Sequence, residues 1–191
     1  MIIDPFTLID QIDSMKIAKR NDFWNFLELY KKPIGIVVGG LNSSFEETLL
    51  KRARTDLFLY IVQKESNAFI ESMKSKMLSN NLYRDCIKII MKTSQEASLL
   101  FADNFFDFIY LEAGRVEKEV KKELELWWPK AKDCCLFSGN GYLYKKNRNG
   151  VNKAANSFFK ENRQELFLTQ EKGKTEEEKL RSFYVFKNMA P

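Results

Sequence analysis

The sequence predicts a three-layer α/β sandwich, and three of its features lead to that expectation. Short apolar runs, typical of strands buried on both faces, alternate with longer amphipathic segments that are typical of helices. Gly and Pro are scarce and scattered, and no internal repeat divides the 191 residues. Strict alternation implies parallel strands joined by right-handed crossovers, which places helices on both faces of one sheet.

Seven apolar runs supply the strands. The first, IGIVVG, follows Pro33 and carries no charge, as expected for a strand in the middle of a sheet. The others share this apolar character and are bounded by polar segments. The predicted strands cover residues 34–39, 57–62, 86–91, 105–111, 134–139, 165–169 and 181–187.

Amphipathic segments between the runs predict the helices. Residues 43–53 begin with Ser43 or Ser44 as the cap and have Glu46 and Glu47 in the first turn, where the helix dipole favours acids. Helices are also expected over residues 66–78, 94–101, 115–130 and 150–162, and in an N-terminal region containing Phe23, Trp24, Leu27 and Tyr30. We therefore expect one domain over 1–191, with a helical extension at 1–32 and an α/β core at 33–188.

Composition excludes several classes of function. The chain has no histidine, so imidazole-based hydrolysis and histidine-ligated metal sites are excluded. Its three cysteines, without a secretory signal, are expected to be reduced thiols, and their spacing fits no zinc motif. No run approaches the roughly 20 apolar residues of a membrane span. We expect a soluble, cytoplasmic protein with no membrane partner.

The mild excess of basic over acidic residues is compatible with an anionic ligand. The formal net charge is +5, and the densest basic patch is YKKNR at residues 144–148. A single-stranded nucleic acid could contact this patch, but a solvated loop is the expectation we favour.

Ligand sites in such sheets lie beyond the carboxyl ends of the strands, so we expect the site residues in the turns that follow them. The first strand ends in GGLNSSF, whose glycines and following helix start suit an anion or a cofactor. The second ends at Gln63, with Glu65 nearby, where an acid usually holds a ribose. The fourth ends at Glu112, which could orient a substrate, act as a base or hold a metal ion. Alternatively, it binds the amides at the start of the following helix or pairs with Arg115.

In these residues the chain resembles the class I S-adenosylmethionine-dependent methyltransferases. The resemblance is also carried by the segments FFDFIYLEAGRVEKEVKKELELWWPKAKDCCLFSGNGYL, GVNKAANSFFKEN and FYVFK. The chain is most similar to the small group with Asp-x-x-His after strand four and Gly-His-Asp-Tyr after strand five. The resemblance covers residues 34–187 and includes the run LWWPK. It implies a Rossmann-like, seven-stranded, mostly parallel sheet with an antiparallel last strand.

The resemblance also implies functional residues. Those expected around S-adenosylmethionine are Gly39, Ser43, Gln63, Glu65, Ser94 and Glu112. Those expected to be catalytic are Glu112, Asn140 and Tyr142. No metal is expected.

Several positions depart from the family pattern. Val37 stands where the family has an acid before the first glycine, and Ser43 stands where it has the second glycine. Gln63 replaces the ribose-binding acid. Arg115 replaces the strand-four histidine, and Cys134 with Cys135 replaces the Gly-Gly turn before strand five. Asn140 with Gly141 replaces the His-Asp pair.

Three hypotheses follow. The first is a methyltransferase that modifies a small-molecule nucleophile, with O-methylation as the expected reaction. The second is a catalytically inactive methyltransferase-fold protein that serves as a binding or assembly module, because the replaced residues weaken cofactor binding. The third, a nucleic-acid modifier using the 144–148 patch, is the least favoured. The sequence defines neither the methyl acceptor nor the oligomeric state, and it is compatible with a homo-oligomer.

Overall fold

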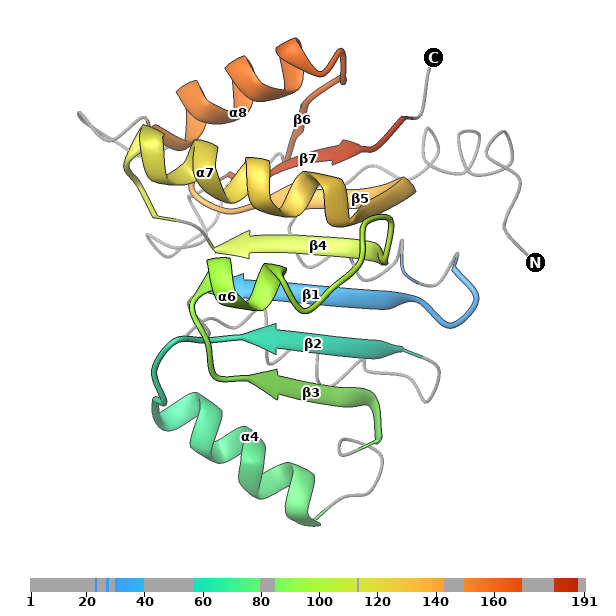
Figure 1. The fold of residues 1–191 in the computed structure, drawn as a ribbon, viewed down its shortest axis with the longest axis vertical. Helices are drawn as coiled ribbons and strands as arrows, with labels where there is room; N and C mark the ends of the chain where they lie inside the picture. The colour runs from blue at the N-terminus through green and yellow to red at the C-terminus, as the bar shows by residue number, and fades with distance from the viewer. Residues whose placement is uncertain are drawn as a thin grey trace.

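The computed structural model describes residues 23, 27, 30–39, 57–79, 85–112, 114–142, 150–169 and 181–188. Within these residues the strands form one seven-stranded sheet in the order β3-β2-β1-β4-β5-β7-β6 (Figure 1). The strands are β1 (Ile34–Gly39), β2 (Phe58–Val62), β3 (Ile87–Ile90), β4 (Phe106–Glu112), β5 (Ala131–Gly139), β6 (Phe167–Leu168) and β7 (Phe183–Phe186).

Strand directions divide the sheet into two parts. The pairs from β3 to β5 are all parallel, so their carboxyl ends lie along one edge. Strand β7 is antiparallel to both β5 and β6, between which it is inserted. The expected Rossmann-like sheet with an antiparallel last strand is therefore confirmed.

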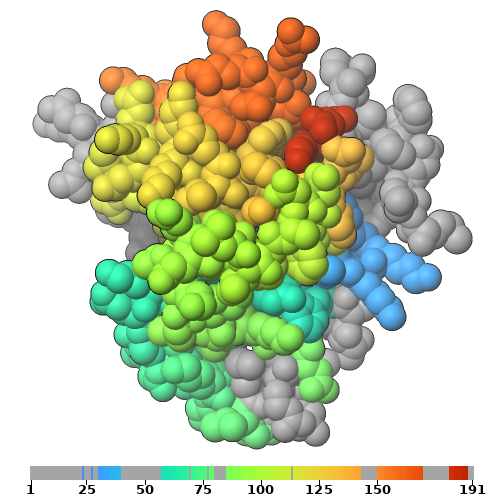
Figure 2. Space-filling view, in the orientation of Figure 1, coloured from blue at the N-terminus to red at the C-terminus, as the bar shows by residue number. Residues whose placement is uncertain are grey.

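Helices cover both faces of the sheet. The helices α6 (Ser94–Ser98), α7 (Glu117–Trp127) and α8 (Gly150–Glu161) pack on one face, which Figure 2 shows covered by their side chains in green, yellow and orange. The other face packs against α4 (Ala68–Ser79) and against Phe23 and Leu27. Each face has its own buried apolar cluster, so the expected three-layer sandwich is confirmed.

Helix α6 differs from its predicted extent. It begins at Ser94, as predicted, with Thr93 as its cap: the Thr93 hydroxyl accepts from the Glu96 amide at 3.3 Å, and the Glu96 carboxylate accepts from the Thr93 amide at 3.0 Å. This reciprocal pair is a capping box. The helix ends at Ser98, and because Leu100 is 56% exposed, no apolar stripe extends it as predicted.

Strand β5 begins three residues before the predicted start. Its first part, containing Lys132 and Asp133, is polar, and the apolar-run criterion therefore missed it. A register shift between β4 and β5 marks an irregularity in this part, where Cys134 has a φ of 61°. A bulge of this kind lets polar residues enter a strand without reversing the faces of the apolar residues that follow.

Some expectations fall outside the described residues. They concern the helix over 43–53, the patch at 144–148, and the extension at 1–32 except for Phe23, Leu27 and residues 30–32. None of the helices in the described part of the chain is long and apolar enough to cross a bilayer.

The amino end of β5 is fixed by a long-range hydrogen bond. The Tyr30 hydroxyl donates to the Cys134 carbonyl at 2.6 Å, across 104 residues of sequence. Burial raises the pKa of the Tyr30 hydroxyl well above its usual value of 10.0, and the thiols of Cys135 and Cys134 and the Asp107 carboxylate raise it further. The folded state therefore retains this proton at pH values where the unfolded chain loses it.

This bond predicts a pH-dependent stability. Because the folded-state pKa is raised, the contribution of Tyr30 to the free energy of unfolding should be constant below about pH 10 and fall as pH rises above it. Tyr30→Phe should cost about 0.5 to 1.5 kcal/mol at neutral pH and make the fall at high pH shallower. Urea unfolding at neutral and alkaline pH measures both effects. Equal alkaline slopes for the variant and the parent would contradict the assignment.

Candidate functional site

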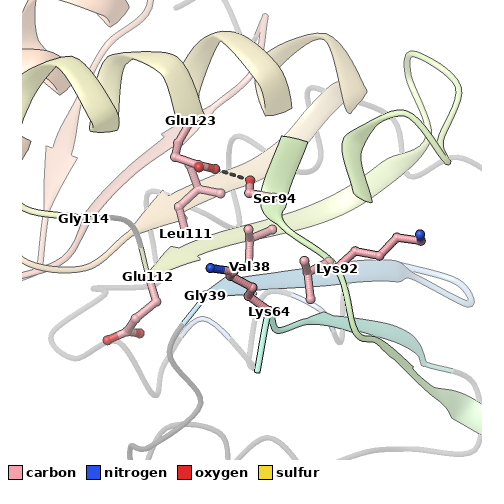
Figure 3. A pocket seen from close by; sticks show the side chains of 10 residues that line it. Val38, Gly39, Lys64, Lys92, Ser94, Leu111, Glu112, Gly114 and Glu123 are labelled. Atoms are coloured by element: carbon pink, nitrogen blue, oxygen red, sulfur yellow. Dashed lines mark hydrogen bonds between the residues drawn. The ribbon is translucent and has the colours of Figure 1, made fainter. Parts of the chain in front are cut away.

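A pocket lies at the carboxyl ends of β1, β2 and β4, the edge where the sequence places the site (Figure 3). Its volume is about 150 Å³. Three predicted site residues line it, Gly39, Ser94 and Glu112, and the parallel strands bring them together from turns far apart in sequence. The complete lining is Val38, Gly39, Val62, Lys64, Lys92, Ser94, Leu111, Glu112, Gly114 and Glu123.

Gly39 is required by the way β1 meets β4. It is the last residue of β1, pairs with Glu112 and has a φ of +92°, in the left-handed region that favours glycine. A Cβ atom at this position would lie 2.6 Å from the Glu112 carbonyl oxygen. Only glycine lets the end of β1 approach β4 this closely, and the pocket opens directly above it.

Glu112 is oriented by Asn140. The Asn140 side-chain amide donates to Glu112 Oε1 at 2.9 Å, and its carbonyl oxygen accepts from the Gly141 amide at 2.8 Å. The Asn140 backbone amide donates to the Leu111 carbonyl at 3.0 Å. The two predicted catalytic residues Glu112 and Asn140 are therefore in direct contact, although Asn140 does not line the pocket.

Ser94 connects two helices at the opposite wall. The indole nitrogen of Trp127 donates to Ser94 Oγ at 2.8 Å, and the Ser94 hydroxyl donates to Glu123 Oε2. Figure 3 shows Ser94 and Glu123 pointing toward one another, while the Glu112 carboxylate lies apart from them and turns away.

Gln63 and Glu65 lie beside the pocket rather than in its lining. Their neighbours Val62 and Lys64 line it, whereas Glu65 is exposed and its carboxylate lies 3.7 Å from Lys64 Nζ. The Gln63 backbone amide donates to the Ile90 carbonyl at 3.0 Å. Its side-chain oxygen is buried and has no hydrogen-bond partner in the part of the chain that the structure describes.

Tyr142 does not line the pocket and is buried in the same apolar cluster as the inner side of α8. It is 7% exposed and packs in the same apolar cluster as Val151. Its hydroxyl accepts a hydrogen bond from the Asn156 side chain at 2.7 Å. The remaining predicted site residue, Ser43, lies outside the described residues.

The pocket combines charges of both signs. Lys64 and Lys92 come from the ends of β2 and β3, and Glu112 and Glu123 from β4 and α7. Such a set suits a polar ligand that carries both donors and acceptors. In the ranges that the structure covers, no three Cys, Asp or Glu side chains gather closely enough to hold a metal ion.

Glu123 is one of three charged pocket residues that the sequence did not predict; the others are Lys64 and Lys92. It lies three residues after Val120 and four before Trp127, so it shares the buried side of α7 with them. A carboxylate among the apolar positions of a helix was the available signal. The lysines were missed because solvated lysines are common in turns after strands.

No protein-family model and no curated protein matches the sequence. Solved structures do share its fold. Spermidine synthase from Thermotoga maritima superposes with a TM-score of 0.58 at 14% identity, over 92% of this chain. The chain spans only 58% of that synthase, so it is much shorter than this relative.

Two other solved structures match over most of both chains. One, provisionally described as an rRNA methylase from Clostridium thermocellum, has a TM-score of 0.65 at 10% identity and covers 91% of this chain and 100% of its own. The other, provisionally described as a caffeoyl-CoA O-methyltransferase from Staphylococcus aureus, has a TM-score of 0.61 at 12% identity, with coverages of 96% and 92%. At these identities the likeness establishes the Rossmann-like methyltransferase fold.

The close approach at Gly39 predicts unequal costs for two glycine substitutions. Gly39→Ala should destabilise the protein by more than the roughly 1 to 3 kcal/mol of a strained backbone, because the Cβ also meets the Glu112 backbone. Gly141→Ala is the matched control: its φ is +81°, but the nearest atom lies 3.8 Å from the new Cβ. Equilibrium unfolding in urea compares them, and equal losses would refute the steric role of Gly39.

Proposed function

We propose that the protein is an S-adenosylmethionine-dependent methyltransferase that modifies a hydroxyl group of a small molecule. The observation that carries the proposal is the pocket above Gly39, where β1 ends beside β4 in a sheet of the methyltransferase type. The crevice outside the carboxyl ends of parallel strands is where open α/β sheets bind ligands. The similar structures differ in the substrates their descriptions name, so the acceptor is proposed from the site itself.

Two features, one in the pocket lining and one beside it, fit the cofactor. Gly39 lines the pocket at the end of β1, so a ligand bound there lies against the backbone at the carboxyl end of this strand. The buried oxygen of Gln63, without a partner among the described residues, is an acceptor that a ribose hydroxyl would satisfy. An unpaired buried acceptor costs about 1 to 3 kcal/mol, so a ligand that pairs it gains binding free energy.

The residues divide the work of methyl transfer between them. Bound S-adenosylmethionine supplies an electrophilic methyl group on a sulfonium. We assign the cofactor to Gly39, Gln63 and Ser94, with Ser43 and Glu65 completing the set that the sequence predicts. Alignment of the acceptor accounts for much of the rate, since holding two reactants in position can contribute about 7 to 11 kcal/mol.

Glu112 is assigned as the proton acceptor. The acceptor oxygen loses its proton as it gains the methyl carbon, and a carboxylate at the end of β4 can take that proton. Asn140 holds the carboxylate in one orientation through its 2.9 Å hydrogen bond. Tyr142 then acts indirectly, because its hydroxyl already accepts from Asn156 and its side chain is buried.

A second function, binding without catalysis, is supported by the same contacts. Both Asn140 and Tyr142 have hydrogen-bond partners within the protein, as structural residues do. A neutral amide, Gln63, also stands where a carboxylate would bind a ribose more strongly. A methyltransferase-fold binding or assembly module would need neither a base nor a tight cofactor site.

Binding of S-adenosylhomocysteine, measured by calorimetry, tests the proposal. We expect saturable binding, and about five- to tenfold tighter binding by Gln63→Asp, because a charged acceptor strengthens a hydrogen bond by about 1 kcal/mol. Gln164→Asp, which adds the same charge near Asn188 and away from the pocket, should leave the affinity unchanged.

The outcomes separate the two functions. No binding at millimolar ligand would contradict a cofactor site. Binding of the cofactor product without methyl transfer to any hydroxyl compound would favour the non-catalytic module. Transfer that is lost in Glu112→Gln while binding is retained would support the assignment of Glu112.

A further inference from the structure

The end of β2 places a neutral amide and a cation at the pocket, where an acid is the usual residue. Gln63 directly follows the last residue of the strand, Val62, and the next residue, Lys64, lines the pocket. In nucleotide-binding sheets of this kind, an acid after this strand accepts from a sugar hydroxyl, whereas a cation nearby accommodates a phosphate on the sugar. The charge at the end of β2 therefore indicates which of these two ligands the pocket suits.

Lys64 is directed across the pocket. Figure 3 shows its side chain extending from the end of β2 toward the end of β1, where Gly39 lies, whereas the Lys92 side chain extends away from the other lining residues. Lys64 is therefore the lysine placed to contact a bound ligand.

The ammonium of Lys64 is held only weakly by the protein. Among the described residues, its ion pair is with Glu65, at 3.7 Å between Nζ and Oε1. The side chains of Lys64 and Glu65 are 71% and 80% exposed, and ion pairs in such exposed positions contribute little stability. An anion on a ligand can therefore replace Glu65 as the partner of this ammonium.

The two acids that line the pocket lie on its other side. Glu123 accepts from the Ser94 hydroxyl at the wall formed by α7, and Figure 3 shows the Glu112 carboxylate turned away. Positive charge at the end of β2 is thus separated from negative charge at α7. The net charge of +5 also favours the approach of anions to the protein as a whole.

Gln63 adds a second requirement beside the anion. Its side-chain oxygen is buried and has no hydrogen-bond partner in the part of the chain that the structure describes. An amide oxygen only accepts, so the ligand group next to it must be a donor, such as a hydroxyl. Because Gln63 and Lys64 are consecutive, a sugar with a hydroxyl beside a phosphate would satisfy both.

We propose that Lys64 binds a phosphate on the sugar of a ligand whose neighbouring hydroxyl donates to Gln63, so that the pocket prefers phosphorylated to unphosphorylated sugars. A lysine ammonium binds phosphate as a compact point charge. The inference goes beyond the proposed function, because S-adenosylmethionine carries no phosphate. A phosphorylated nucleoside in this pocket excludes the cofactor and thereby inhibits the proposed reaction.

Calorimetry with adenosine and with its 2′- and 3′-monophosphates tests the preference, because these ligands differ by one phosphate. The parent protein should bind at least one monophosphate about tenfold more tightly than adenosine at low salt. The difference should shrink at high salt, which screens exposed charges. Lys64→Met should bring the ratio of the two affinities close to one.

Lys74→Met is the matched control. Lys74 is an exposed lysine of α4 that lies outside the pocket lining and pairs with Glu71 at 2.9 Å, so its removal should leave the preference intact. A preference that persists in Lys64→Met would overturn the assignment, as would equal affinities of the parent protein for adenosine and both monophosphates.

Binding of S-adenosylhomocysteine, measured in parallel, separates this inference from the proposed function. Binding of S-adenosylhomocysteine without a preference for phosphate would overturn the inference alone. A preference that depends on Lys64, without binding of S-adenosylhomocysteine, would support the inference and contradict the proposed function. Failure of every ligand to bind would overturn both.

Discussion

The close pairing of β1 and β4 at their carboxyl ends is the constraint on which the site depends. Gly39 pairs with Glu112 at the last position of both strands, where a Cβ would lie 2.6 Å from a backbone oxygen. Since the strands stay paired to their ends, the chain leaves both at the same edge of the sheet. The end of β1, the fourth-strand carboxylate and the space between them are consequently fixed relative to each other.

The helices complete the pocket from one face. Val120, Leu124 and Trp127 bury the inner side of α7 in the cluster above β1 and β4, which places Glu123 at the pocket wall. The capping box of Thr93 and Glu96 begins α6 immediately after β3, so that Ser94 meets Trp127 and Glu123. The hydrogen-bonded chain of Trp127, Ser94 and Glu123 therefore both joins the two helices and forms a wall of the pocket. It links the stability of the helix layer to the shape of the pocket.

The sequence predicted most of the fold because apolar runs and helix caps are local signals. It located all seven strands of the described sheet, and the family resemblance predicted its antiparallel β7. It misplaced the start of β5, where Lys132 and Asp133 enter the strand at a bulge, and it extended α6 beyond its end at Ser98. It predicted Gly39, Ser94 and Glu112 as site residues, and all three line one pocket, but it did not predict Glu123. The bond from Ser94 to Glu123 joins residues 29 apart and depends on how two helices cross, which no local pattern encodes.

A crystal structure of the protein with S-adenosylhomocysteine tests the central claim most directly, because it shows where a ligand lies relative to the paired ends of β1 and β4. The account requires the ligand to pass over Gly39, with its ribose hydroxyls near Gln63 and another part of the ligand against Ser94. A ligand bound elsewhere on the protein, or one whose ribose lies away from Gln63, would contradict it.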